Sequence, residues 1–378
     1  MYYICALMIS ILLCELLQKY SVRIGNFHTK NHVYLGMFLS FLPLFFLAAF
    51  RWDLGVDTIY ATGHYSAGYR LASVGRNDIN YAVGFFKFFE LFASNGIPLF
   101  WCYFTITCMY FCAIFYLIKK LRLDLFWTVV TFFGIDLYIF SFSAVRQSLA
   151  FVFIFVALAV FFQDEKRNYL KTFLLLVLAT SIHYTCIIYF GLILLDFLVR
   201  KKKFVGFKRA TVFNFMVGGV VLSPLMYYMA KKFILSNFYL GGLVLTKFTP
   251  SYLVFSAFFL WIGYQYWKGI VKQNPKYSIL VVAMVALFFL TVLSPVIYHM
   301  DRVFHLFCPI FLIYIPVLWK SIAVQTERYM IFLMIVVIMM YLIKAYFIPI
   351  PGSLDYEAFG TYHSVFENWD YYTTLGKY

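Results

Sequence analysis

Long apolar runs, interrupted by short charged segments, dominate the pattern of the chain. Such runs predict helices that cross a lipid bilayer, since a span needs about 20 mainly apolar residues. The pattern predicts about twelve spans, read from the apolar runs and the charges that bound them. Their expected positions are 2–18, 33–50, 98–118, 125–141, 148–162, 170–182, 184–199, 210–230, 251–268, 278–298, 303–319 and 329–347.

We therefore expect an all-α, polytopic integral membrane protein with a single transmembrane domain over residues 1–378. Two segments are expected on the extracytoplasmic side: the large loop 51–97, which follows the second span, and the C-terminal tail 348–378. Positions 81–93 within the loop have the spacing of an amphipathic helix, which would lie in the membrane interface. The alternative for this stretch is a simple loop over the bundle.

Composition and charge agree with this class. Hydrophobic residues make up 64% of the chain and charged residues 12%, against about 25% charged residues in soluble domains. Soluble, disordered and disulfide-stapled secreted proteins are thereby excluded. The net charge of +15 follows the positive-inside rule, so nucleic acid is not an expected partner. Most cations gather in alternate, cytoplasmic loops, namely 19–32, 119–124, 163–171, 200–209, 268–277 and 320–328.

The segment 172–199 lies between two of these basic loops. One long helix would place the two loops on opposite sides of the membrane, whereas a helical hairpin keeps both inside. The charge pattern therefore predicts a hairpin that turns at His183, at or within the outer leaflet. Backbone at that depth must be covered by protein or line a wet cavity.

Four basic side chains stand in tight turns at the predicted outer boundary: Arg51, Arg146, His183 and Arg302. A guanidinium group offers a rigid fork of donors that matches a phosphate in a bidentate way. These arginines are therefore candidates for binding a lipid-linked diphosphate. The alternative is that each one anchors its helix at the interface, with its charge directed toward water.

Candidates for acid–base chemistry lie in the same turns. Asp53, Asp57 or His183 could accept a proton from a sugar hydroxyl. The carboxylates could instead pair with Arg51, and His183 could be a hydrogen-bonded turn residue. No metal or cofactor is expected, because no Asp-x-Asp, P-loop or CxxC motif occurs. A metal at His299, Asp301 and His305 is disfavoured, because these residues straddle a loop and a helix start.

Four short motifs in order resemble the EpsG family, which comprises Wzy-type polymerases of bacterial exopolysaccharide, capsule and O-antigen. The motifs cover most of the chain. They are Arg51…Gly55-Val-Asp57…Tyr60, Ser143-Ala-Val-Arg146-Gln147-Ser-Leu-Ala150, Ser181-Ile-His183-Tyr-Thr185 and Asp301-Arg302.

The resemblance implies a GT-C-like glycosyltransferase of the bacterial inner membrane whose active site faces the periplasm. It implies substrates that are undecaprenyl-diphosphate-linked oligosaccharides. The growing glycan would leave its lipid diphosphate and join the non-reducing end of a new lipid-linked repeat unit, without nucleotide sugars or metal. A chain-length regulator protein and membrane lipid are the other partners considered.

The expected roles follow from this reaction. Arg146 and Arg302 would stabilise the leaving diphosphate with help from Arg51, where positive charge acts most strongly as the bond breaks. Asp57 or His183 would take the acceptor's proton. The remaining binding candidates for diphosphate or glycan are Gln147, Tyr60 and Asp53, and the aromatic residues expected to stack on sugars are Trp52, Tyr60, Tyr65, Tyr69 and Tyr103.

Two other classes remain open. A lipid-linked glycan transporter or flippase would need a cationic cavity open to both faces and inverted repeats, and the sequence shows neither. A membrane acyltransferase acting on glycans would need a thioester donor.

Overall fold

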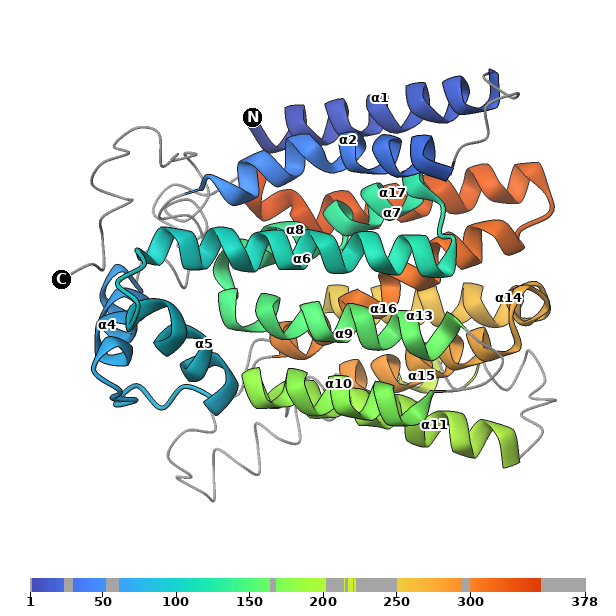
Figure 1. Cartoon of the computed structure of the whole chain (residues 1–378). Coiled ribbons are helices and arrows are strands. Elements are labelled where there is room, and N and C mark those ends of the chain that lie inside the picture. Colours follow the sequence, from blue (N-terminus) through green and yellow to red (C-terminus); the bar gives the residue numbers. More distant parts are fainter. Residues whose placement is uncertain are drawn as a thin grey trace. The chain divides into compact units, whose positions relative to one another are not determined.

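The computed structural model describes residues 2–23, 30–51, 61–163, 168–201, 214, 217–219, 221, 250–293 and 300–347, and every regular element in these ranges is a helix (Figure 1). The chain divides into two compact units. Unit 1 comprises Met1–Phe190 and Met339–Tyr378, and unit 2 comprises Gly191–Ile338.

Unit 1 is built from paired helices. Neighbours in sequence pack together in the pairs α1 with α2 and α9 with α10, while α6 packs along α9. The elements are α1 (Tyr2–Arg23), α2 (Lys30–Ala49), α4 (Ala61–Ser73), α5 (Val83–Ala93), α6 (Leu99–Leu121), α7 (Leu125–Gly134), α8 (Leu137–Ser143), α9 (Val145–Gln163), α10 (Tyr169–Ile182) and the 3-10 helix η1 (Tyr184–Tyr189).

Unit 2 has its own core, in which α13 packs against α15 and α15 against α16. The Tyr314 hydroxyl donates a hydrogen bond to the Phe259 carbonyl at 2.6 Å, and this approach needs Gly263, where a Cβ would lie 2.2 Å from that hydroxyl. The elements are α11 (Phe190–Lys201), α13 (Pro250–Gln265), α14 (Trp267–Gln273), η2 (Pro275–Tyr277), α15 (Ser278–Val292), α16 (Met300–Ser321) and α17 (Gln325–Phe347), whose last part belongs to unit 1.

Aromatic rings fill the interior of unit 1. Phe41 of α2 meets Phe111 of α6 edge to face at 6.2 Å between ring centroids, and Phe111 meets Phe132 of α7 at 5.7 Å. Edge-to-face contacts of this kind contribute about 0.5–1.5 kcal/mol each beyond area burial. They bind apolar helices together where helix association has no hydrophobic driving force, as in lipid.

The predicted number of membrane spans is confirmed only in part. Each predicted span except 210–230, which lies mostly outside the described residues, coincides with one helix or with two consecutive helices. Within the described residues, four helices are long and apolar enough to cross a membrane, or up to five with a bent pair. The protein is thus a membrane protein whose regular elements within the described ranges are all helices. The four helices are Leu99–Leu121, Val145–Gln163, Pro275–Val292 and Phe304–Ser321.

The predicted span 125–141 is not one continuous helix. It is broken between α7 and α8, which are bent by 47°. Asp136 stands at the break with φ of 67°, a left-handed conformation that Asp tolerates better than most residues. The break turns α8 so that the Tyr138 hydroxyl donates to the Leu44 carbonyl at 2.8 Å, at the end of α2.

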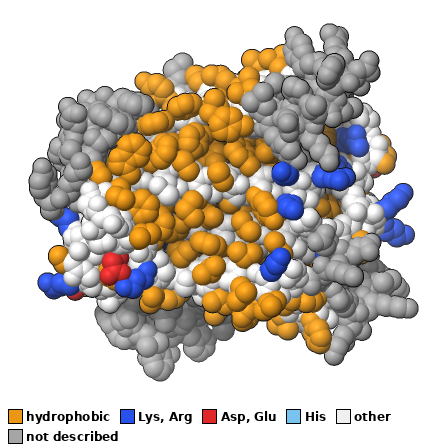
Figure 2. Space-filling view, in the orientation of Figure 1, with side chains coloured by type: hydrophobic (Ala, Val, Ile, Leu, Met, Phe, Trp, Pro, Cys, Tyr) orange, Lys and Arg blue, Asp and Glu red, His pale blue; other side chains and the backbone are white. Residues whose placement is uncertain are grey.

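The predicted hairpin at His183 is present. Helix α10 ends at Ile182, and the Phe173 ring lies 5.4 Å from that of Phe190 on the returning segment. On the face shown in Figure 2, hydrophobic side chains cover the middle of α6, α9 and α10, and Lys and Arg side chains gather toward the helix ends. This distribution is the one expected of helices whose middle faces lipid.

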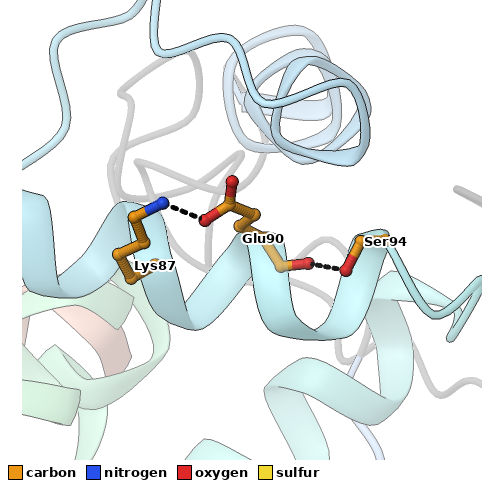
Figure 3. Close-up of polar contacts among 3 residues, drawn as sticks. All are labelled: Lys87, Glu90 and Ser94. Carbon is orange, nitrogen blue, oxygen red and sulfur yellow. Dashed lines mark hydrogen bonds and ion pairs between the residues drawn. The ribbon is translucent and has the colours of Figure 1, made fainter.

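The loop 51–97 is partly helical rather than a simple loop. Helices α4 and α5 pack against each other, and together with the segment between them they form a small layer that we call the cap (residues 61–93). Phe85 and Phe89 of α5 are buried in the cap. On its exposed side, Lys87 pairs with Glu90 at 2.5 Å, and the Ser94 hydroxyl donates to the Glu90 carbonyl (Figure 3). The predicted helix is therefore present, and its predicted place in the membrane interface stays a prediction.

Candidate functional site

Two of the predicted motifs meet at one end of unit 1. The short connection between α9 and α10 and their long contact make them an antiparallel pair, so the start of α9 lies beside the end of α10 (Figure 1). The cap contacts this end, because a Cβ at Gly84 of α5 would lie 2.6 Å from the Ser181 hydroxyl. Arg146 and His183 therefore belong to one region, which we call the cap end of unit 1.

Arg51 joins three helices at this end. Its Nη1 donates to the Ala48 carbonyl and, at 3.2 Å, to the Thr107 hydroxyl of α6. Its Nη2 donates to the Ser141 carbonyl of α8 at 3.2 Å, and its Cζ lies 4.8 Å from the centre of the Phe142 ring. Arg51 is buried, so these contacts compensate the cost of removing its charge from water. The side chain thus ties α2 to α6 and α8.

Arg146, the second residue of α9, is held in a different way. Its Cζ lies 5.4 Å from the centre of the Tyr81 ring and 6.0 Å from that of Tyr65. Both rings come from the cap, and they stack on each other at 6.2 Å. Within the described residues, no hydrogen bond or ion pair reaches the half-buried Arg146 guanidinium. Its N–H donors are therefore not used by that part of the protein.

Local sequence explains why Tyr81 reaches this place. The Asn77 side chain closes the turn before α5: its Nδ2 donates to the Tyr81 carbonyl at 2.9 Å, and its Oδ1 accepts from the Tyr81 amide at 2.8 Å. Asn80 takes a left-handed φ of 55° within this turn. Gly68 of α4 leaves room for the ring, since a Cβ there would lie 2.5 Å from two of its atoms.

The Tyr81 hydroxyl stays protonated at neutral pH. Burial of the side chain raises the pKa of Tyr81, neighbouring Tyr65 acts in the same direction, and Arg146 opposes them. The partner of the Arg146 charge is thus a neutral ring and not a phenolate. The positive charge of Arg146 is not cancelled by Tyr81 and remains available to an anion.

Gln147 is buried next to Arg146, with 3% of its surface exposed. Its Nε2 finds no hydrogen-bond partner among the residues that the structure describes. An amide donor in this condition costs about 1–3 kcal/mol. One physical reason to retain such a residue is that its amide donates a hydrogen bond to the substrate, which is present only in the bound state.

His183 caps α10 and is half-buried. Its Nδ1 lies 2.7 Å from the Thr185 hydroxyl. If Nδ1 carries the proton and donates to Thr185, the Nε2 lone pair can accept a proton. The motif Ser181-Ile-His183-Tyr-Thr185 therefore combines a helix cap with an oriented imidazole.

The other predicted site residues are not tested by the described structure. Arg302 lies in the first turn of α16, in unit 2, and its side chain is outside the described residues. Asp53, Asp57 and Tyr60 also lie outside the described residues. Their roles stay predictions. In the described ranges, no group of three or more His, Cys, Asp or Glu side chains could hold a metal ion.

One expectation is wrong. Tyr65 and Tyr69 were expected to stack on sugar rings, but both are buried within the cap, where the Tyr69 hydroxyl donates to the Ile97 carbonyl at 2.5 Å. Their rings pack against Phe89 instead. The sequence reasoning treated them as loop aromatics because it assigned no helix to positions 61–73.

Sequence reasoning also missed the residues that contact the two arginines and the residues that hold those contacts in place. Thr107 and Ser141 lie within apolar runs and gave no signal by themselves. Asn77, Gly68 and Tyr81 could have been recognised in part, since an Asn-Asp-x-Asn stretch before an amphipathic run is typical of a turn. Nothing in the pattern connects that turn to α9.

Taken together, the fold and the cap end define an all-helical membrane protein with a cationic, aromatic-lined site at one end of its helices. The sequence model of the EpsG family matches residues 34–359, so the chain belongs to this family and is a membrane protein of the polysaccharide-polymerase type. Comparison with curated proteins gave no match, and neither did comparison with solved structures.

Proposed function

We propose that the protein polymerises lipid-linked oligosaccharide repeat units on the extracytoplasmic face of the bacterial inner membrane. The growing glycan leaves undecaprenyl diphosphate and is joined to the non-reducing end of a new lipid-linked repeat unit. The architecture proposed for it is GT-C-like, with about twelve spans when segments outside the described residues are included. The observation that carries the proposal is Arg146, whose charged fork lies at the cap end near His183.

In the proposed step, the bond between the anomeric carbon and the phosphate oxygen breaks, and the lipid diphosphate leaves with the bonding electrons. A hydroxyl of the incoming repeat unit forms the new bond to the anomeric carbon. Its proton passes to a base, which is Asp57 or His183. Negative charge grows on the leaving oxygen as the bond breaks and is larger in the transition state than in the bound substrate, so an arginine fork there lowers the barrier and does more than bind substrate.

Arg146 and Arg302 have the same role in this proposal, and Arg51 helps them from within the fold. Arg146 donates to the leaving diphosphate, and Arg302 supplies a second fork. Gln147 donates its buried Nε2 to the same ligand or to the adjacent sugar. Asp53 and Tyr60 contact the glycan. The reaction needs neither a nucleotide sugar nor a metal ion, because the lipid diphosphate is itself the activated donor. A chain-length regulator protein is a proposed partner.

The test is to incubate the purified protein in lipid vesicles with undecaprenyl-diphosphate-linked repeat units extracted from the producing cell, with chelator present and no nucleotide sugar. A ladder of longer glycans is expected from the wild type. Arg146→Lys should lower the rate about 10-fold, because a lysine keeps the charge but loses the planar fork. Absence of any ladder contradicts the polymerase proposal.

Two controls separate the rival classes. Movement of the unextended substrate across the vesicle membrane, without a ladder, would favour a transporter. A product formed only after addition of an acyl thioester would favour an acyltransferase. Arg70→Lys in α4 serves as the matched control for Arg146→Lys, since Arg70 is exposed on the cap and should not alter the rate.

A further inference from the structure

Tyr81 stands where three parts of unit 1 meet. Its ring contacts the Arg146 guanidinium of α9, fills the space left by Gly68 of α4, and follows the turn closed by Asn77. It also packs edge to face on Phe85 of α5 at 5.2 Å. The ring is buried, so it is fixed from several sides.

The partner that Tyr81 offers to Arg146 is the face of an aromatic ring and not an acidic side chain. A guanidinium that stacks on rings keeps its N–H donors in its own plane, pointing away from the rings. An acidic partner would hold Arg146 as firmly, but it would consume the same donors and cancel the charge. Tyr81 and Tyr65 together hold the Arg146 guanidinium, and they neither use its N–H donors nor cancel its positive charge.

We propose that Tyr81 is a positioning residue for Arg146, and that with Tyr65 it fixes the guanidinium so that its N–H edge is presented to the leaving diphosphate. This inference rests on the proposed function of the cap end. It gives the cap a purpose beyond covering the helices: the cap orders an arginine that belongs to a transmembrane helix. Gly68 and Asn77 contribute because they place the Tyr81 ring.

The matched pair of variants is Tyr81→Leu and Tyr69→Leu. Both residues are buried tyrosines of the cap, and both pack on Phe89, but only Tyr81 contacts Arg146. Tyr81→Leu should lower kcat for ladder formation about 10-fold with little change in KM, because a cation–π contact that orders the half-buried guanidinium is of that size. Tyr69→Leu should change kcat less than about 2-fold even though it destabilises the cap by a similar amount.

Two further variants probe the geometry. Tyr81→Phe keeps the ring and should retain most of the activity, which a role for the hydroxyl would not allow. Gly68→Ala places a methyl group 2.5 Å from Tyr81 atoms; it should displace the ring and reproduce the loss of kcat seen for Tyr81→Leu.

The decisive comparison is a double-mutant cycle with Arg146→Gln. If Tyr81 acts through Arg146, Tyr81→Leu has almost no additional effect once the guanidinium is absent. If Tyr81 only stabilises the cap, the two losses of activity multiply. Multiplying effects, or full kcat in Tyr81→Leu, would overturn the inference while the ladder formed by the wild type still supports the polymerase proposal.

A second readout does not depend on polymerisation. Arg146 can be modified by phenylglyoxal, and the extent at each arginine can be read by mass spectrometry. Tyr81→Leu should change the modification rate at Arg146 while Tyr69→Leu leaves it as in the wild type. Equal rates in the wild type and both variants would contradict the positioning role, whether or not the wild type forms a ladder.

Discussion

Arg51 and Arg146 lie in the same unit, and the sequence predicts the same task for both. The structure surrounds them differently. The Arg51 donors reach two backbone carbonyls and a hydroxyl on three helices. Arg146 meets only the faces of two tyrosine rings among the residues described. The residue type is the same, but the Arg51 guanidinium is used by the fold, whereas the Arg146 guanidinium donates no hydrogen bond to the residues described.

The difference shows how a membrane protein can build a cationic site. A charged group in an apolar setting must be satisfied by the protein or held near a polar region. The charge of Arg51 is satisfied by the protein. Its hydrogen bond to the Ser141 carbonyl links α2 to the broken span. The Ser148 hydroxyl of α9 approaches the same carbonyl at 3.4 Å. Arg51 thus helps to set the turn that presents Arg146, and it supports the site through the backbone.

The largest effect expected from this comparison concerns stability. Arg51→Met should lower the free energy of unfolding by about 3 kcal/mol, because several hydrogen bonds from a buried charged donor are lost and their acceptors stay buried. Arg146→Met should lower it by about 1 kcal/mol, because a half-buried cation–π contact is lost and no hydrogen bond within the described residues is lost with it. Thermal unfolding of both variants in the same detergent measures this. Equal losses would remove the distinction between the two arginines.

Much of this arrangement follows from the sequence. The apolar runs predict the helices, the charge pattern predicts the hairpin at His183, and the phenylalanine spacing predicts α5. Each of these depends on periodicity or on local charge, which a single sequence contains. The motif with Arg146 and the motif with His183 were also expected on one side of the membrane, and they do share one end of unit 1.

The contacts that make the surroundings of Arg51 and Arg146 different did not follow from the sequence. The break at Asp136 lies in a run that is apolar enough for one continuous helix, and the hydrogen bonds that the broken segment makes with α2 and α6 come from residues distant in the sequence. The partners of Arg51 are separated from it by 56 and 90 positions. Small hydroxyl residues within apolar runs, such as Thr107, resemble ordinary helix residues until their neighbours are known.

Gln147 offers a smaller test on the side of Arg146. Gln147→Leu should raise the free energy of unfolding by about 1 kcal/mol, because it removes a buried amide that lacks a partner in the described residues. The same variant should lower the rate of ladder formation about 10-fold if the amide donates to substrate. Gain in stability with loss of activity is expected of a binding group. If Gln147→Leu lowers both the free energy of unfolding and the rate of ladder formation, the amide has a structural role.

An effect on stability alone is expected at Thr107, the hydroxyl that Arg51 reaches in α6. Thr107→Val keeps the shape of the side chain and removes one acceptor, so the free energy of unfolding should fall by about 1 kcal/mol. The hydroxyl also donates to the Tyr103 carbonyl at 3.0 Å, and that bond is lost in any background.

The informative measurement is therefore the cycle with Arg51→Met. Thr107→Val lowers the free energy of unfolding in part through Arg51, and this part should vanish when Arg51 is absent. The remaining loss of stability comes from the local hydrogen bond with the Tyr103 carbonyl. A full loss in both backgrounds would mean that Thr107 does nothing for Arg51. The attachment of α2 to α6 would then depend on the aromatic contacts between these helices, and the Ser141 carbonyl would be the acceptor that matters for the turn before Arg146.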